Sequence, residues 1–126
     1  MKRFLIMFGV ACVFAGAAIA ASQPSPEDQR RDAIRLLRAI NTAENAFASR
    51  NQGRHAVLQE LIEQPMMGGV KPDLIVSGSG VTYKGAQVRL ALSADTTQYV
   101  VTVVAPSGVA AFTDERGVIY TGEALK

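Results

Sequence analysis

With 126 residues, the chain is long enough for at most one domain. Its formal net charge is +2, and two of its thirteen basic residues, Lys2 and Arg3, stand at the start of the sequence. The rest of the chain carries eleven basic and eleven acidic side chains. This balance lacks the basic footprint that binding to nucleic acid requires, so we expect no nucleic-acid partner.

The first 21 residues have the pattern of a secretory signal peptide. Lys2 and Arg3 form a short positive region, and the apolar run Phe4–Ala18 follows without a charge before small residues end it. We expect cleavage after Ala20 or Ala21, which would leave a periplasmic or secreted protein with no stable membrane span. The alternative is a retained membrane anchor, because the apolar run approaches the shortest length that crosses a bilayer.

The only cysteine, Cys12, lies inside that apolar run. Lipidation of Cys12 is disfavoured, because Gly9 stands where a branched apolar residue is usual. The mature chain, residues 22–126, is then expected to be a single domain without disulfides or thiol chemistry.

A long helix is predicted from Pro26 to about Arg50. Ser25 can cap this helix, Pro26 suits its first position, and acidic residues follow at the positive end of the helix dipole. Apolar residues recur at helical spacing along the segment, and Gly53 lies just past its end. A helix of about 25 residues spans about 37 Å, so we expect the other elements to pack along it.

A shorter helix is expected at His55–Glu63, where Pro65 would stop it, and Met66–Pro72 is expected to be a loop. From Val81 onward, the hydrophobic period changes to two.

Short turn sequences at 94–97, 106–108 and 114–117 separate runs rich in β-branched residues, which predicts hairpins and an antiparallel meander. The predicted fold class is therefore α+β, with a long N-terminal helix packed on an approximately four-stranded antiparallel meander sheet. One face of the sheet should be apolar and lie on the helix, and the other should be wetter.

The search for catalytic residues finds no candidate. His55 is the only histidine, and we interpret it as a solvated residue at a helix start, because no cysteine or second histidine is available to join it. The segment 77–80 (Ser-Gly-Ser-Gly) resembles a nucleophile elbow or a phosphate loop. Both of those motifs lead into a helix, whereas a strand is predicted here, so we interpret the segment as a turn. We expect no catalytic residue and no cofactor, and hence no enzyme.

Three acidic residues, Asp95, Asp114 and Glu115, could supply oxygen ligands for calcium. Calcium takes six or more oxygens, and the sequence Asp-Glu-Arg-Gly at 114–117 is more simply a hairpin turn, so no metal site is predicted.

Arg31, Arg35 and Arg38 recur at helical spacing and form a basic stripe. This stripe could contact anionic lipid headgroups. The favoured interpretation is a solvated face on which Glu27 and Asp32 form ion pairs with the arginines. The nearby polar residues 41, 42 and 45 are expected to form a solvent face or a polar contact with the sheet.

Three segments carry a resemblance to a known family: Leu37–Ser49, Leu58–Leu61 and Phe112–Tyr120. They resemble the long helix, the short helical turn and the last hairpin of the headgroup in bacterial type IV pilins and type II secretion pseudopilins. The resemblance covers about residues 33–120. A pilin also carries a glutamate five residues into its apolar helix, and this chain has no acidic residue before Glu27. The resemblance therefore implies a pilin-like headgroup fold on a secreted chain or a diverged accessory protein.

From these observations we expect an exported, non-enzymatic protein that acts through protein–protein contacts at the bacterial envelope. Pilus or secretion-system proteins are the partners that the resemblance implies. The alternative is a free periplasmic binding or inhibitor domain that uses the exposed sheet face or the loop Met66–Gly80. Met66 and Met67 would suit an adaptable contact surface, or they would fill a gap over the core. A small hydrolase is disfavoured, because no nucleophile–base pair is visible.

Overall fold

The structure is a computed structural model that describes residues 24–123. The predicted signal peptide, Met1–Ala21, lies outside the described residues, as does Cys12 within it. Among residues 24–123, no helix is both long and apolar enough to cross a membrane.

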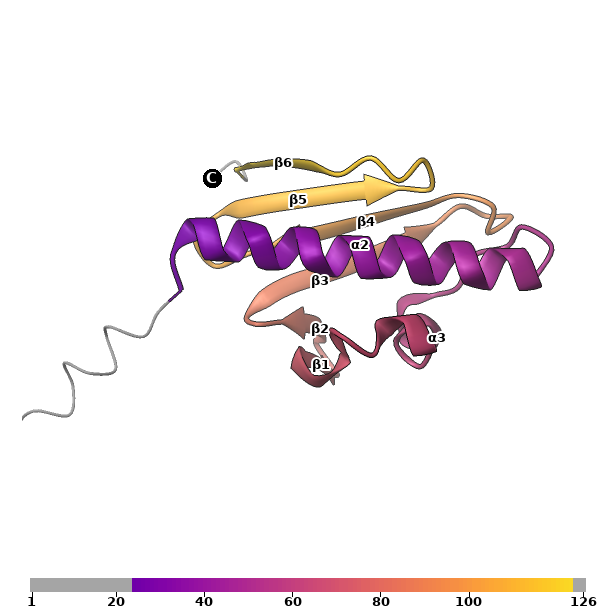
Figure 1. Cartoon of the computed structure of the whole chain (residues 1–126), viewed down its shortest axis with the longest axis horizontal. Coiled ribbons are helices and arrows are strands. Elements are labelled where there is room, and N and C mark those ends of the chain that lie inside the picture. Colours follow the sequence, from indigo (N-terminus) through magenta and orange to yellow (C-terminus); the bar gives the residue numbers. More distant parts are fainter. Residues whose placement is uncertain (1–23, 124–126) are drawn as a thin grey trace, which may run out of the picture.

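Helix α2 (Pro26–Arg50) runs along the whole length of the sheet, as Figure 1 shows. Its start agrees with the predicted cap, because the hydroxyl of Ser25 accepts a hydrogen bond of 3.1 Å from the backbone N–H of Asp28. Past its end, Gly53 has a φ of 82°, a left-handed conformation that suits glycine. The predicted bounds of this helix are confirmed.

Helix α3 (Leu58–Ile62) is shorter than the predicted helix at His55–Glu63. The backbone N–H of His55 donates to the carbonyl of Thr96 at 2.7 Å, and that of Ala56 donates to the carboxylate of Glu44 at 2.8 Å. These tertiary bonds hold the chain extended as far as Val57, so the helix begins only after it. The short 3₁₀ turns η1 (Pro65–Met67) and η2 (Lys71–Asp73) follow in the segment that was predicted as a loop.

The sheet has six strands, where about four were predicted, and neighbours in sequence are neighbours in space throughout. All five pairings are antiparallel, so the predicted meander is confirmed. The strands are β1 (Leu74–Ser77), β2 (Gly80–Tyr83), β3 (Ala86–Leu92), β4 (Tyr99–Val104), β5 (Val109–Asp114) and β6 (Tyr120–Glu123).

Strand β1 lies inside the segment Met66–Gly80, which was expected to be a loop. The strand gave no alternating pattern because Ile75 and Val76 are adjacent in sequence and both exposed. It forms a hairpin with β2 through residues 78–79, so the Ser-Gly-Ser-Gly segment is a turn between two strands, as interpreted.

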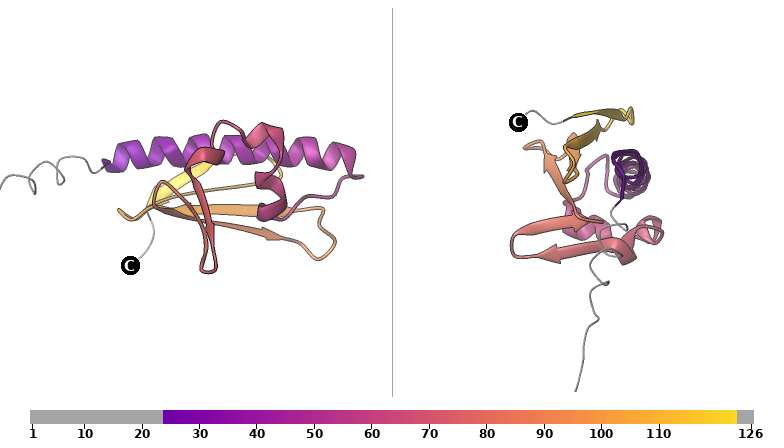
Figure 2. Two further views of the ribbon diagram at one scale, coloured as in Figure 1. Left: turned by 90° about the horizontal axis from the view of Figure 1, so that it is seen from below. Right: turned by 90° about the vertical axis from the view of Figure 1, so that its left-hand side faces the viewer.

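Helix α2 covers one face of the sheet, and the hydrophobic core lies between these two layers (Figure 2). Every second residue of β4 points into the core, beginning with the fully buried Tyr99. The helix supplies Leu36, Leu37 and Ile40, none of which has any exposed surface. The prediction that the apolar sheet face lies on the long helix is confirmed.

Candidate functional site

A cluster of polar side chains lies inside the core, between α2 and the sheet. Its first part is Glu44, on α2, whose side chain has no exposed surface. Its Oε1 accepts the 2.8 Å bond from Ala56 and lies 3.5 Å from Nδ1 of His55. The His55 side chain is only 8% exposed, and its ring makes an edge contact with Tyr99 at 4.7 Å between centroids. The interpretation of His55 as a solvated helix-start residue is therefore wrong.

The second part of the cluster is centred on Asn41, one turn before Glu44 on α2. The hydroxyl of Tyr99 donates to Oδ1 of Asn41 at 2.5 Å, and Nδ2 of Asn41 donates to the hydroxyl of Thr113 at 3.1 Å. Asn41 thus joins the helix to β4 and β5 and makes the expected polar contact with the sheet. Its neighbours Thr42 and Asn45 are exposed and form the expected solvent face.

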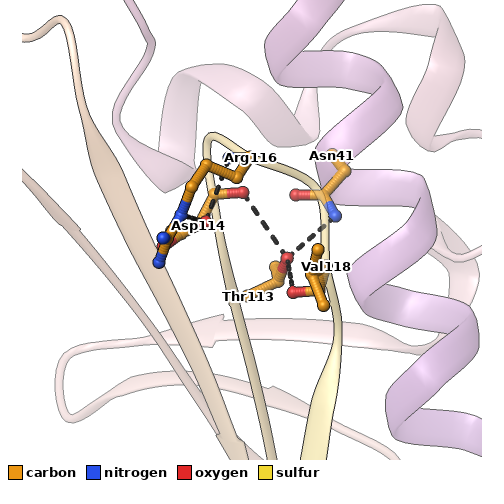
Figure 3. A network of polar contacts seen from close by, with 5 residues as sticks. All are labelled: Asn41, Thr113, Asp114, Arg116 and Val118. Carbon is orange, nitrogen blue, oxygen red and sulfur yellow. Dashed lines mark hydrogen bonds and ion pairs between the residues drawn. The ribbon is translucent and has the colours of Figure 1, made fainter.

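The polar contacts continue from Thr113 into the connection between β5 and β6 (Figure 3). The hydroxyl of Thr113 donates to the carbonyl of Val118 at 2.8 Å. On the outer side of the same connection, Arg116 forms a 2.7 Å ion pair with Asp114 and lowers the pKa of that carboxyl. The path from Tyr99 through Asn41 and Thr113 therefore fixes the start of the edge strand β6.

Burial raises the pKa of Glu44 to about 7, although the hydrogen bond from Ala56 opposes this shift. A buried carboxyl beside a histidine is an arrangement that can transfer protons. Here the carboxyl has no surface that a substrate could reach, and its bond to Ala56 holds the loop after α2 in place. We therefore interpret Glu44 and His55 as a structural pair that closes the core.

The structure separates the residues that were weighed for calcium. Oδ1 of Asp95 accepts hydrogen bonds from Ser93 and Thr97 within its own turn, and Asp114 is held by Arg116. Within residues 24–123, no group of three or more potential ligands is placed to hold a metal ion.

The basic stripe on α2 is exposed, but its ion pairs differ from the prediction. Arg31 pairs with Asp28 at 3.2 Å, and Asp32 lies 3.5 Å from Lys84 on the sheet side of the helix. Glu27 pairs with Arg30 at 2.9 Å, so the predicted pairings of Glu27 with Arg31 and of Asp32 with Arg35 are both wrong. Asp32 points toward Lys84 in the β2–β3 turn.

The outer face of the sheet, which points away from α2, is the largest departure from expectation. Phe112 on β5 and Tyr120 on β6 are 48% and 45% exposed, and their rings stack at 5.0 Å between centroids. Val100 on β4 is 48% exposed on the same face. This face is more exposed to solvent than the covered face, as predicted, but along β4–β6 it also carries large apolar side chains that were not predicted.

Strand pairing defines the rows of side chains on this outer face, because directly paired residues project to the same side. The central row contains Arg89, Thr102, Phe112 and Tyr120. The row on one side contains Gln87, Val104, Ala110 and Gly122, and the row on the other contains Ala91, Val100 and Asp114. Arg89 and Asp114 are the two charged residues in these three rows. We call these rows the outer patch.

Sequence reasoning missed the outer patch, although its members were visible. The segments of β4 and β5 were recognised as strands from their β-branched residues, but residues of both phases are apolar in β4, as in Tyr99-Val100-Val101. Such a run is the signal of a strand that is covered on both faces.

The fold and the site together define an α+β protein in which one long helix covers one face of a six-stranded antiparallel sheet. No protein-family model, curated protein or solved structure matches the chain.

Proposed function

We propose that this is an exported, non-enzymatic protein with a pilin-headgroup-like fold that acts through protein–protein contacts at the bacterial envelope. The observation that carries the proposal is the outer patch. An antiparallel sheet with one covered face normally presents polar side chains on the other. Here two stacked aromatic rings and a valine occupy that face beside small residues, which is the composition of a contact surface.

The order of the elements supports the family part of the proposal. A long helix, a short helical turn and an antiparallel meander ending on an edge strand follow one another as in the headgroups that the sequence resembles. Pilus or secretion-system proteins are accordingly the partners we propose first.

Site-specific photo-crosslinking in intact cells tests this proposal. A photoreactive benzoylphenylalanine at position 112 would lie in the contact surface, and the same group at Asn45, exposed on α2, provides the matched control. We expect adducts with other envelope proteins from position 112 and none from position 45. Absence of adducts at position 112, or equal adducts at both positions, would contradict the proposal.

The export step is tested separately by the mass of the mature protein. Cleavage at the predicted site would give a chain that begins at Ala21 or Ser22. A chain that retains Met1 in the cell envelope would overturn the predicted cleavage but leave the contact surface in place.

The alternative of a free periplasmic binding or inhibitor domain is favoured by a second group of exposed apolar side chains. Met66 is 52% exposed, and Ile75 and Val76 on β1 are 63% and 53% exposed. Met67 is fully buried and fills the core, so of the two methionines only Met66 offers a contact surface. Adducts with a soluble periplasmic protein from position 66, and none from position 112, would favour this alternative.

A further inference from the structure

We propose that the outer patch binds the outer patch of a second copy of this chain, so that two sheets pack face to face around a twofold axis parallel to the strands. This inference deepens the proposed function and rests on its claim that the patch is a contact surface. It adds the identity of one partner and the geometry of the contact.

The shape of the outer patch suits packing against a second sheet. Strands β3–β6 lie at a spacing of about 4.8 Å, and five residues of a strand span about 17 Å, so the patch is a plane of roughly 19 by 17 Å. Such a plane matches the inner faces of β-sandwiches, in which two sheets pack about 10 Å apart.

The central row of the outer patch is complementary to itself. A twofold axis between β4 and β5 places β3 of one copy against β6 of the other. Arg89 then lies over the ring of Tyr120 in the second copy, and Thr102 lies over Phe112. An arginine over an aromatic face is a favourable contact, and Arg89 appears in none of the ion pairs of the described residues.

The neighbouring row, which contains Gln87, Val104, Ala110 and Gly122, is also complementary to itself. The same axis places Val104 over Ala110 of the second copy, and Gln87 over Gly122, so that a larger side chain always meets a smaller one. In the third row the same axis places Val100 over Asp114 of the second copy, where the carboxylate of Asp114 keeps its ion pair with Arg116.

The competing orientation is disfavoured by charge. A twofold axis perpendicular to the strands would also bring two patches together, but it would place Arg89 against Arg89. The charges therefore select the axis parallel to the strands. Because a patch of this size covers only about 650 Å² over the two copies, below the range of stable interfaces, we expect a weak, transient dimer with a dissociation constant on the order of 100 micromolar.

Sedimentation of the full chain, purified as the cell processes it, tests whether the dimer forms. We expect a concentration-dependent monomer–dimer equilibrium. Because each of the two copies contributes its Phe112 to the interface, Phe112→Thr should weaken dimerisation at least tenfold. Met66→Thr removes an exposed apolar side chain elsewhere and should leave it unchanged. A monomer at all concentrations, or a dimer that Phe112→Thr does not weaken, would overturn the proposal.

Crosslinking between two cysteine variants tests the orientation, in a Cys12→Ser background. A mixture of Arg89→Cys and Tyr120→Cys chains should be joined by a short bis-maleimide, and each variant alone should not. A crosslink from Arg89→Cys alone would overturn the proposed axis. Circular dichroism confirms that each variant is folded, which is expected because both side chains point outward.

The two proposals fail separately. If the pure chain stays monomeric while position 112 still forms adducts with other envelope proteins, the dimer is wrong and the proposed function stands. If the pure chain dimerises while position 112 forms adducts only with its own copy, the proposed envelope partners are wrong and the dimer stands.

Discussion

Each face of the sheet carries side chains that are unusual for its surroundings. The covered face holds a buried carboxyl, an amide and a threonine hydroxyl between helix and strands, whereas the open face holds a stacked aromatic pair and a valine. Buried polar groups are costly unless they are hydrogen-bonded, and exposed aromatic pairs gain little in water. The comparison teaches that the inner cluster serves the fold, and that the outer patch is best explained by a contact outside the monomer.

The two regions are also connected. Asn41 donates a hydrogen bond to Thr113, and Thr113 donates one to the carbonyl of Val118, two residues before β6 begins. The position of β6 sets the place of Tyr120 beside Phe112. The buried network thus holds the outer patch in shape.

Ionisation of the buried Glu44 carboxyl should have the largest effect on stability, and it should make stability depend on pH. Glu44 has a pKa of about 7 in the folded protein and an ordinary value of 4.5, so the folded state binds more protons than the unfolded state between these values. Stability should therefore fall as pH rises from about 4.5 to 7, by up to about 3 kcal/mol from this group.

Chemical denaturation of wild type and Glu44→Gln across this pH range measures the effect. The amide oxygen of glutamine still accepts the bond from Ala56 but does not ionise, so the variant should lose most of the decrease. An equal decrease in the free energy of unfolding of both proteins would show that ionisation of Glu44 does not cause it.

Removing the amide of Asn41 should have the next largest effect. Asn41→Leu has a similar volume but leaves the buried hydroxyl of Tyr99 without its acceptor, so we expect a loss of about 2 to 3 kcal/mol in the free energy of unfolding. Asn45→Leu, at an exposed position on the same helix, should change stability by less than about 0.5 kcal/mol. Equal effects at both positions in urea denaturation would contradict the proposed network.

Adjacent residues of β4 compare the two faces directly. Val101 has no exposed surface and Val100 is 48% exposed. Truncating each valine to alanine therefore compares a buried with an exposed position on the same strand. Val101→Ala should cost about 2 kcal/mol, because it removes two buried methyl groups and leaves a small cavity. Val100→Ala should cost less than about 0.5 kcal/mol at protein concentrations where the chain is monomeric, and a larger loss there would mean that the outer face already belongs to the core.

The smallest expected effect is that of the outer patch on the stability of the monomer. Phe112→Thr removes one stacked ring but keeps a good strand former, so unfolding should change by less than about 1 kcal/mol in dilute solution. The melting temperature at high protein concentration should fall much more, because a dimer stabilises its own fold by mass action. Equal shifts at both concentrations would show a role in the fold alone.

The sequence predicted the elements that carry a periodic signal and missed those that depend on tertiary contacts. The cap at Ser25 and the apolar stripe were sufficient for α2, and the turn sequences were sufficient for the meander. Strand β1 lacks alternation, and the chain before α3 is held extended by Glu44 from twelve residues away.

The burial of the polar residues could not be predicted either, because it also depends on tertiary contacts. Glu44 and His55 are ordinary surface residue types, and only the fold brings them together at 3.5 Å. The outer patch could have been found by noting that β4 is apolar at consecutive positions, which is unusual for a strand with one face in water.

Fluorine NMR of the full chain labelled with fluorophenylalanine tests the central claim most directly, that the outer face is a contact surface. Within the described residues the label enters at Phe112, on that face, and at Phe47, which packs against the core. Assignment follows from Phe112→Tyr and Phe47→Tyr variants. On raising the protein concentration, and on adding envelope extract, the signal of Phe112 should shift and lose contact with solvent while that of Phe47 stays unchanged. A Phe112 signal that stays constant and solvent-exposed under both conditions would contradict the claim.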